Sequence, residues 1–218
     1  MNDFPQPLPA ADLARARALA TTLLSDVAAG DVAMRHDVSP VRSDMRMAGA
    51  AVTVDLPPGD NTALHAALYQ RGTGYVLVAD GHDHRDHAYA GEIMVRAARA
   101  LAWEGLVVAG LLRDRAALEE IGLPVFGQGF HPVGPRKAEP GRINVPITCA
   151  GVPVHPGDLV VGDADGVVVI PRAEVPAVLT AAEEKRDREA ARLATIAGFD
   201  PERDDPAVLR PVWLRAAG

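Results

Sequence analysis

The residues best suited to chemistry lie on either side of one apolar segment. Gly91 and Glu92 open a predicted helix before the strand-like segment 106–109, and Arg113 and Asp114 follow that segment. Ligands of open α/β sheets bind outside the carboxyl ends of the strands. The order of these residues therefore predicts one crevice that holds a helix amino terminus, an arginine and two carboxylates.

The side chains at these positions indicate anion and metal chemistry. Asp114 fits a ligand of Mg²⁺ or Mn²⁺, which take carboxylate and water oxygens, but an aspartate at this place also fits a helix N-cap. Arg113 suits a substrate carboxylate, with a structural ion pair as the alternative. The free amides after Gly91 form an anion site. Glu92 is either an acid that orders the waters of a metal or a first-turn residue favoured by the helix dipole.

A loop with three histidines precedes this unit. His82, His84 and His87 lie in the run Gly-His-Asp-His-Arg-Asp-His. Two histidines in an H-x-H pair can bind zinc from one face of a strand, so a zinc hydrolase is one hypothesis. The polar composition favours instead a solvated loop beside the substrate, where it would tune specificity.

Covalent catalysis has little support in the sequence. The chain has two lysines, Lys137 and Lys185, and both stand among polar residues, whereas a Schiff-base lysine needs an apolar pocket. The single cysteine, Cys149, excludes disulfides and cysteine zinc sites within one chain. The pair Gly72 and Gly74 lacks the third glycine of a dinucleotide fingerprint, and no glycine loop carries a Walker lysine. Metal-assisted chemistry is therefore the expectation.

Composition bounds the class of protein. The 218 residues are 48% hydrophobic and 23% charged, which is typical of a globular protein. The net charge of -7 disfavours a nucleic-acid surface. No uncharged apolar run approaches the ~18 residues that suggest a membrane span, and no signal peptide is recognised at the amino terminus. The expectation is a cytoplasmic protein with neither a nucleic-acid nor a membrane partner.

The elements around the crevice alternate between helix and strand. Hydrophobic spacing and turn residues predict helices at 9–28, 61–70, 91–104, 115–121 and 173–196, and strands at 48–55, 75–79, 106–109 and 122–126. Short strands follow at 144–148, 152–154, 158–162 and 166–170. An α/β half thus precedes a β-rich half. Beyond it, a proline-broken tail at 198–218 contains the apolar triplet 212–214, which suggests docking onto a neighbouring subunit.

Several ordered motifs give the chain a resemblance to a known family. They are the run 59–68 (Gly-Asp-Asn-Thr-Ala-Leu-His-Ala-Ala-Leu), Gly91-Glu92, Gly110-Leu-Leu-Arg-Asp114, Asn144-Val-Pro-Ile, and the segments 156–163 and 165–171. Together they cover about residues 15–195 and resemble the RraA-like superfamily. That superfamily includes the 4-hydroxy-4-methyl-2-oxoglutarate/4-carboxy-4-hydroxy-2-oxoadipate aldolases. An acidic residue followed after twenty positions (93–112) by Arg-Asp is its chemical signature.

The resemblance implies a fold and an assembly. The fold would be α/β, a swivelling-type α/β/β sandwich domain with a C-terminal helix and an extended tail. Residues 1–197 would form one catalytic domain, and 198–218 a tail that packs on a neighbouring subunit. The chain would assemble as a homotrimer or as a hexamer of two trimers, with the active site between subunits.

The resemblance also implies roles for residues. Asp114 would bind Mg²⁺ or Mn²⁺ mostly through waters, and Glu189 of a neighbouring subunit, or less well Glu184, would reach those waters. Arg113 would stabilise the enolate. A second group would hold the substrate: the amides around Gly91, Glu92, Ile93 and Met94, together with the side chain of Asn61.

The resulting function is a class II pyruvate aldolase that cleaves a 4-hydroxy-2-oxo acid and decarboxylates oxaloacetate. The acids Glu92 and Asp114 and the cation Arg113 would act on a small 2-oxo acid. The alternative is a non-catalytic RraA-like regulator that binds an endoribonuclease. A methyltransferase is not supported, because no glycine-rich loop for S-adenosylmethionine is recognised.

Overall fold

The computed structural model describes residues 4–70, 72–211 and 214. Its main sheet has eight strands in the order β1-β7-β5-β3-β2-β11-β12, with β8 paired to β2. The strands are β1 (Ser39–Pro40), β2 (Met47–Asp55), β3 (Tyr75–Asp80), β5 (Gly105–Ala109), β7 (Val125–Gly127), β8 (Arg142–Ile143), β11 (Leu159–Asp163) and β12 (Gly166–Ile170). Strands β2, β3, β5 and β7 are parallel, and β1, β8, β11 and β12 join antiparallel. Because β1 also contacts β12, the sheet is nearly closed.

Both faces of this sheet are buried, which explains the unbroken apolar runs of its parallel strands. Successive side chains of a strand point to opposite faces. On β3, Leu77 and Ala79 therefore pack under helices, and Val76 and Val78 fill the concave interior. The interior is completed by the hairpin of β9 (Ile147–Cys149) and β10 (Val152–Val154).

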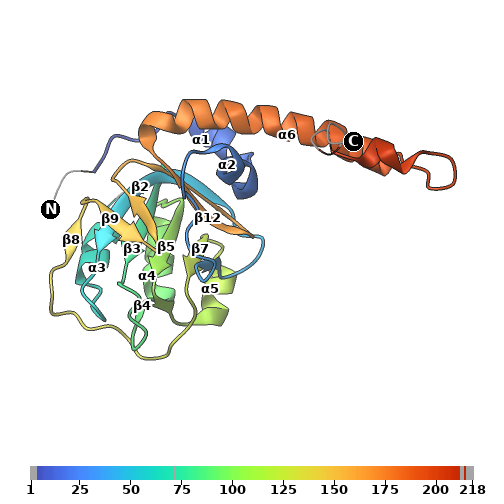
Figure 1. Ribbon diagram of the computed structural model, residues 1–218. Coiled ribbons are helices and arrows are strands. Elements are labelled where there is room, and N and C mark those ends of the chain that lie inside the picture. The colour runs from blue at the N-terminus through green and yellow to red at the C-terminus, as the bar shows by residue number, and fades with distance from the viewer. Residues whose placement is uncertain (1–3, 71, 212–213, 215–218) are drawn as a thin grey trace.

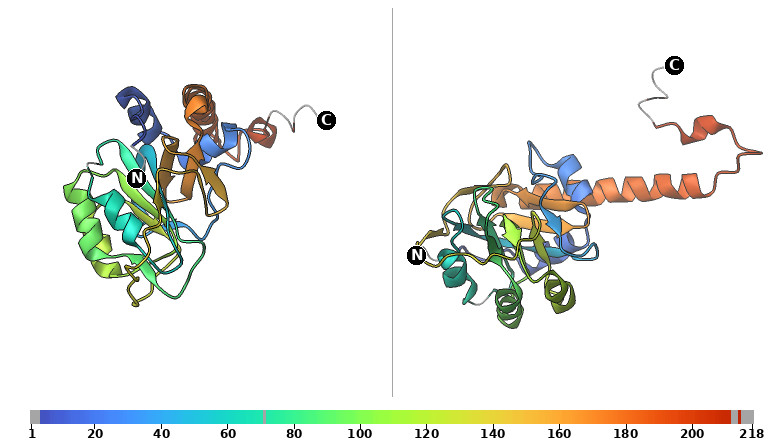
Figure 2. Two further views of the ribbon diagram at one scale, coloured as in Figure 1. Left: turned by 90° about the vertical axis from the view of Figure 1, so that its left-hand side faces the viewer. Right: turned by 90° about the horizontal axis from the view of Figure 1, so that it is seen from below.

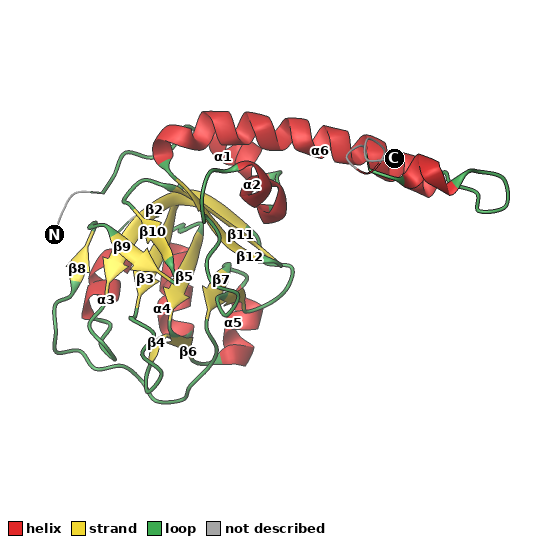
Figure 3. Cartoon of the chain, in the orientation of Figure 1, coloured by secondary structure: helices red, strands yellow, loops and turns green. Residues whose placement is uncertain are grey.

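Two groups of helices cover the outside (Figures 1 and 3). Helices α3 (Thr62–Leu68), α4 (Glu92–Ala100) and α5 (Arg115–Ile121) pack over β2, β3, β5 and β7. Helices α1 (Ala10–Arg17), α2 (Thr21–Val27) and the start of α6 (Val175–Ala197) pack over β2, β11 and β12. Within the described ranges, no helix is both long enough and apolar enough to cross a membrane.

The far half of α6 leaves the body of the protein (Figure 2). From residue 186 to the end of the helix its side chains are exposed, including the apolar Leu193 and Ile196. The described part of the tail forms the 3-10 helix η2 (Pro206–Leu209), and the Leu209 carbonyl accepts a hydrogen bond from Arg192 Nη2 at 3.2 Å. The tail thus folds back on its own helix. Of the apolar triplet expected to dock, residues 212 and 213 lie outside the described residues, and Leu214 is exposed.

The predicted α/β class is confirmed, but several boundaries were wrong. The helix expected at 91–104 ends at Ala100, and the strand expected at 122–126 begins only at Val125. The helix expected at 9–28 is two helices, because the chain turns at Leu19 and the buried Asp163 carboxylate accepts hydrogen bonds from Thr21 N and Oγ1 at 2.9 and 2.6 Å. The histidine loop ends in a short strand, β4 (Ala88–Ala90), which pairs with β6 (Leu111–Leu112). The strand expected at 144–148 begins only at Ile147, in β9.

Candidate active site

A second, small pairing of strands builds the predicted crevice. β4 and β6 lie side by side, and the Arg113 amide donates to the Ala90 carbonyl at 3.0 Å. The residues after β4 therefore meet the residues after β6. Gly91 marks the contact, since a Cβ atom there would lie 2.4 Å from Asp114 Oδ2 and 2.7 Å from Arg113 Cγ. Only glycine leaves room for both side chains in this arrangement.

Asp114 stands at the start of α5, but its side chain bonds to the start of α4. It occupies the N-cap position of α5 but makes no side-chain cap bond there, and its backbone is left-handed at φ 61°. Its Oδ2 instead accepts the Glu92 amide of α4 at 3.0 Å. The alternative of a simple α5 cap is thus wrong. Asp114 Oδ1 has no hydrogen-bond partner among the described residues, and the side chain is 43% exposed, so this oxygen is available to a cation.

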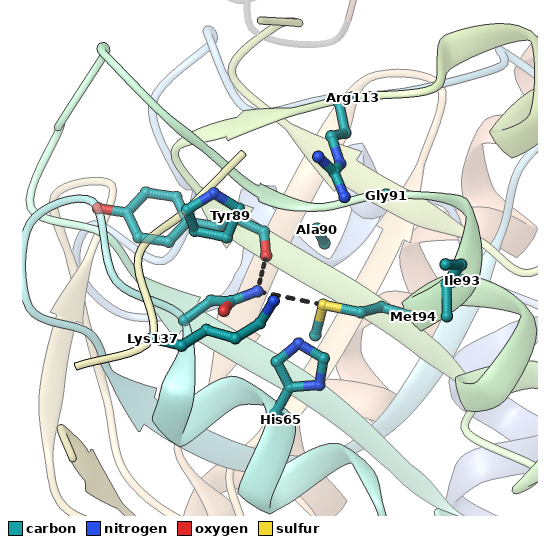
Figure 4. A pocket seen from close by; sticks show the side chains of 10 residues that line it. His65, Tyr89, Ala90, Gly91, Ile93, Met94, Arg113 and Lys137 are labelled. Carbon is teal, nitrogen blue, oxygen red and sulfur yellow. Dashed lines mark hydrogen bonds between the residues drawn. The ribbon is translucent and has the colours of Figure 1, made fainter. Parts of the chain in front are cut away.

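Arg113 lines a cavity of about 160 Å³ with Asn61, His65, Tyr89, Ala90, Gly91, Ile93, Met94, Pro135 and Lys137 (Figure 4). Its guanidinium is packed between two glycines, because a Cβ atom at Gly134 would lie 2.7 Å from Arg113 Nη1. Its nearest acid is Asp114, with Nε 3.7 Å from Oδ2. That separation is too long for a hydrogen bond, so the guanidinium keeps its donors for a ligand.

Asn61 forms a polar part of the cavity wall, and only one end of its side-chain amide has hydrogen-bond partners. Its Nδ2 donates to the Tyr89 carbonyl at 2.8 Å and contacts Met94 Sδ at 3.3 Å. Its Oδ1 is buried and has no hydrogen-bond partner in the described structure. Buried polar atoms are nearly always paired, so this oxygen calls for a ligand hydroxyl or a water.

Asp60 fixes the segment that carries Lys137. Its carboxylate accepts the amides of Thr62, Ala138 and Glu139 at 2.8, 2.6 and 3.1 Å. Burial alone would raise the pKa of Asp60, but these backbone donors outweigh it and lower the pKa to about 2. The segment is therefore held over the start of α3, and the Lys137 side chain reaches the cavity (Figure 4).

The other side chains of the cavity tune its electrostatics. Burial, and then the charge of Lys137, lowers the pKa of His65, so its imidazole is neutral near pH 7. Burial also raises the pKa of Tyr89, whose hydroxyl donates to the Gly81 carbonyl and accepts the Gly59 amide, both at 2.9 Å. Tyr89 thus ties the histidine loop to the turn before Asn61.

Most of the predicted site residues are brought together here. Six of them line the cavity or adjoin it directly: Asn61, Gly91, Ile93, Met94, Arg113 and Asp114. Glu92 is adjacent through its amide, but its carboxylate accepts from Arg96 Nε at 2.8 Å, one turn along α4. Glu189 lies on the projecting half of α6, where it pairs with Lys185 at 2.9 Å, and Glu184 lies 3.9 Å from Arg188. Neither glutamate lines the cavity of its own chain.

Sequence reasoning missed two cationic or basic groups of the cavity. His65 follows Asn61 by four positions on the predicted helix, so helical spacing could have placed both on one face. Lys137 stands in a polar loop, and its sequence neighbours give no sign of a cavity. No pattern in the neighbouring sequence indicates that the Asp60 carboxylate accepts hydrogen bonds from that loop.

The three histidines do not form one metal site. His82 Nε2 lies 2.7 Å from Asp55 Oδ1, whereas His84 Nε2 and His87 Nδ1 lie 2.9 Å from each other. None of the three lines the cavity of Arg113. Cys149 is also no nucleophile, because complete burial raises its pKa. The zinc-hydrolase hypothesis therefore lacks a set of histidines that could bind one zinc ion together.

Comparison with known proteins identifies the family of this chain. The family model RraA-like, described as Aldolase/RraA, matches residues 21–169, and the chain belongs to this family. A protein of Halalkalibacterium halodurans named "Putative 4-hydroxy-4-methyl-2-oxoglutarate aldolase" is 38% identical over 176 residues, which is 81% of this chain and 84% of that protein.

Several solved structures are similar to this chain. The RNA-processing inhibitor RraA from Thermus thermophilis is 30% identical with a TM-score of 0.65, over 70% of this chain and 92% of that one. An uncharacterized protein from Pseudomonas syringae pv. tomato is 25% identical with a TM-score of 0.78, over 91% and 98% of the two chains.

Proposed function

We propose that this protein is a divalent-metal-dependent class II aldolase that releases pyruvate from a 4-hydroxy-2-oxo acid and also decarboxylates oxaloacetate. The observation that carries the proposal is one small cavity with two cations, Arg113 and Lys137, beside a carboxylate that is open to a metal. The aldolase name of the relative from Halalkalibacterium halodurans supports the same activity.

The cavity suits a 2-oxo acid. In the first turn of α4, the amides of Ile93 and Met94 have no earlier carbonyl of the helix to bind. These amides and Arg113 would hold the carboxylate and 2-oxo group of the pyruvyl part. Lys137, from the opposite wall, would bind a second carboxylate, and Asn61 Oδ1 would accept from the 4-hydroxyl. A dianionic substrate is therefore expected.

The residues present fit a hard divalent cation. Asp114 Oδ1 is open, and Mg²⁺ or Mn²⁺ needs few protein carboxylates when waters and substrate oxygens complete its shell. When bound, the cation would act as a Lewis acid toward the 2-oxo group. Arg113 would hold preorganised positive charge at the same oxygen as the enolate develops.

Two glutamates are candidates for moving the proton. The Glu92 carboxylate is held by Arg96 in an exposed ion pair, and such pairs contribute only about 0–1 kcal/mol, so it can turn toward the cavity. Glu189 projects away from its own cavity and would act in a second copy of the chain. Retro-aldol cleavage and decarboxylation share the pyruvate enolate, so one proton donor serves both reactions.

Pyruvate release tests the proposal. The full-length protein with Mg²⁺ or Mn²⁺ should release pyruvate from oxaloacetate or a 4-hydroxy-2-oxo acid, and Arg113→Ala and Asp114→Asn should each lower kcat/KM by about 10²–10³-fold. Arg115→Ala is the matched control, since Arg115 pairs with Glu119 and does not line the cavity. Absence of pyruvate with every such acid would refute the activity.

We further propose a homotrimer or hexamer with the site between subunits. Asp114→Asn and Glu189→Gln proteins, each inactive alone, should regain about a quarter of wild-type activity when unfolded and refolded together, because mixed cyclic interfaces then restore some sites. Recovery of no activity, with normal assembly by light scattering, would contradict a shared site.

The second candidate function is a protein-binding regulator like RraA. It is favoured by the projecting half of α6, which exposes Leu193 and Ile196, and by the likeness to the inhibitor from Thermus thermophilis. Replacing both residues by serine should abolish capture of an endoribonuclease if this function holds. If pyruvate release is present and no endoribonuclease is bound, the regulator is excluded.

A further inference from the structure

Three possible ligands converge at the edge of the main sheet, away from the cavity of Arg113. Asp55 and Asp80 are the last residues of the neighbouring parallel strands β2 and β3, and they are register partners. His82 follows two residues after Asp80, with a left-handed φ of 53° that returns its ring to the strand ends. Two of these side chains come from strands, so the sheet itself sets their spacing.

The distances suit one metal ion. His82 Nε2 lies 2.7 Å from Asp55 Oδ1, His82 Nδ1 lies 3.4 Å from Asp80 Oδ2, and one ligand atom from each residue falls within 4.8 Å of the others. In a tetrahedral zinc shell with bonds of about 2.0–2.2 Å, neighbouring ligand atoms are about 3.3–3.6 Å apart. The two carboxylates face different nitrogens of the His82 ring, so this half-exposed ring would turn for one nitrogen to share an ion with both.

The charges at this edge also call for a cation. Asp80 is buried beside its register partner Asp55, so the ends of β2 and β3 bring two carboxylates together. Asp55 Oδ2 is held by Arg142 Nε at 2.7 Å, which leaves Oδ1 for His82. Arg142 is one positive charge against two carboxylates, and a divalent cation would balance the remainder.

Two of the three residues, Asp55 and His82, face a hollow that is open to solvent, while Asp80 is buried behind them. Asp55, His82, Glu139, Gly141 and Arg142 are among the residues that line a hollow of about 320 Å³. It gives a cation an entry path and leaves room for a water as the fourth ligand. Glu139 also stands at this hollow and adds negative charge.

We propose that Asp55, Asp80 and His82 form a binding site for a zinc-class divalent cation, independent of the metal of the aldolase reaction. One imidazole nitrogen and two carboxylate oxygens are ligands that Zn²⁺ takes, while Mg²⁺ prefers oxygen alone. The bound ion would join the ends of β2 and β3 to the loop that follows β3.

Zinc binding by the full-length, chelator-treated protein tests this site. Asp114→Asn protein should still bind one Zn²⁺ per chain by elemental analysis after dialysis, and Co²⁺ should give visible absorption bands. In that background His82→Gln should weaken Zn²⁺ binding more than about 100-fold, since loss of an outer-shell partner already costs about 10–100-fold. Asp80→Asn is a second variant with the same expectation if His82→Gln does not fold.

Two histidine variants serve as controls. His155→Gln should bind normally, because His155 faces one carboxylate, Asp158, at 3.6 Å. His84→Gln should bind normally as well, since His84 contacts His87. Unchanged binding in His82→Gln, loss in His84→Gln, or no stoichiometric Zn²⁺ in Asp114→Asn protein would each overturn the site. Pyruvate release with Mg²⁺ is read separately, so failure of the aldolase activity leaves this result unaffected.

Discussion

Gly91→Ala offers a direct test of how the site is assembled. The added Cβ atom would lie 2.4 Å from Asp114 Oδ2 and 2.7 Å from Arg113 Cγ, whereas ordinary contacts of such atoms begin at 3.4 Å. Both side chains must therefore move by roughly 1 Å. Misplacement by ~1 Å can cost about 10²-fold in rate, which equals about 2.7 kcal/mol of transition-state stabilisation.

The fold itself should tolerate this change. The backbone of Gly91 is extended, at φ -153° and ψ -166°, so alanine is not strained there. Arg113 and Asp114 are about two-fifths exposed and can turn into solvent. The remaining cost is the poorer alanine N-cap of α4, about 1 kcal/mol.

The assay is kcat/KM for pyruvate release, with urea unfolding measured beside it. Gly198→Ala is the matched control, because its Cβ would lie 3.5 Å from the nearest atom and its φ is negative. We expect Gly91→Ala to lose activity and Gly198→Ala to keep it, with Gly91→Ala less stable by no more than about 1 kcal/mol. Wild-type kcat/KM in Gly91→Ala would refute the assembly of the site around this glycine.

Three further outcomes follow from the cavity walls. Asp60→Asn should lower the free energy of unfolding by about 2 kcal/mol at pH 7, because the Asp60 pKa is lowered from 3.8 to about 2 in the folded protein. This stabilisation is present above pH 4 and is lost as the pH falls toward 2. A difference in urea unfolding between the two proteins that stays constant from pH 7 to 3 would contradict it. Lys137→Met should raise KM by about 10–100-fold by removing a charged hydrogen bond and change kcat less, while Arg115→Met, outside the cavity, should not; an unchanged KM would exclude contact with the substrate. Tyr89→Phe should destabilise by about 2 kcal/mol, since two buried backbone groups lose their partner, and a loss below 0.5 kcal/mol in thermal unfolding would count against that contact.

The sequence predicts the meeting of Gly91 with Arg113 and Asp114 because the rule for strand ends needs only the order of elements. The structure gives a more specific cause: β4 and β6 pair, and this places the start of α4 against the residues after β6. The short β4 lay inside what composition suggested was a loop. Three residues carry too little pattern to distinguish a strand from a loop.

Lys137 and the break at Leu19 could not be predicted, for a shared physical reason. Each is set by one buried carboxylate far away in the chain. Asp60 fixes the loop of Lys137, and Asp163 fixes the first residue of α2, Thr21. Hydrophobic periodicity reports which face of an element is buried, but it carries no information on a single polar contact over 70 or more positions.

Backbone strain at Asp114 favours chemistry over packing as the reason for that residue. A non-glycine residue in the left-handed region costs about 1 kcal/mol or more, and at a helix start an aspartate normally offsets it with a cap. Asp114 makes no such bond to α5. Its carboxylate instead crosses to the Glu92 amide and keeps one oxygen open. Glycine at the start of α5 would be less strained, so stability alone gives no reason for a carboxylate at this position. The reason is chemical: the carboxylate places an open oxygen at the positive end of α4, next to Arg113.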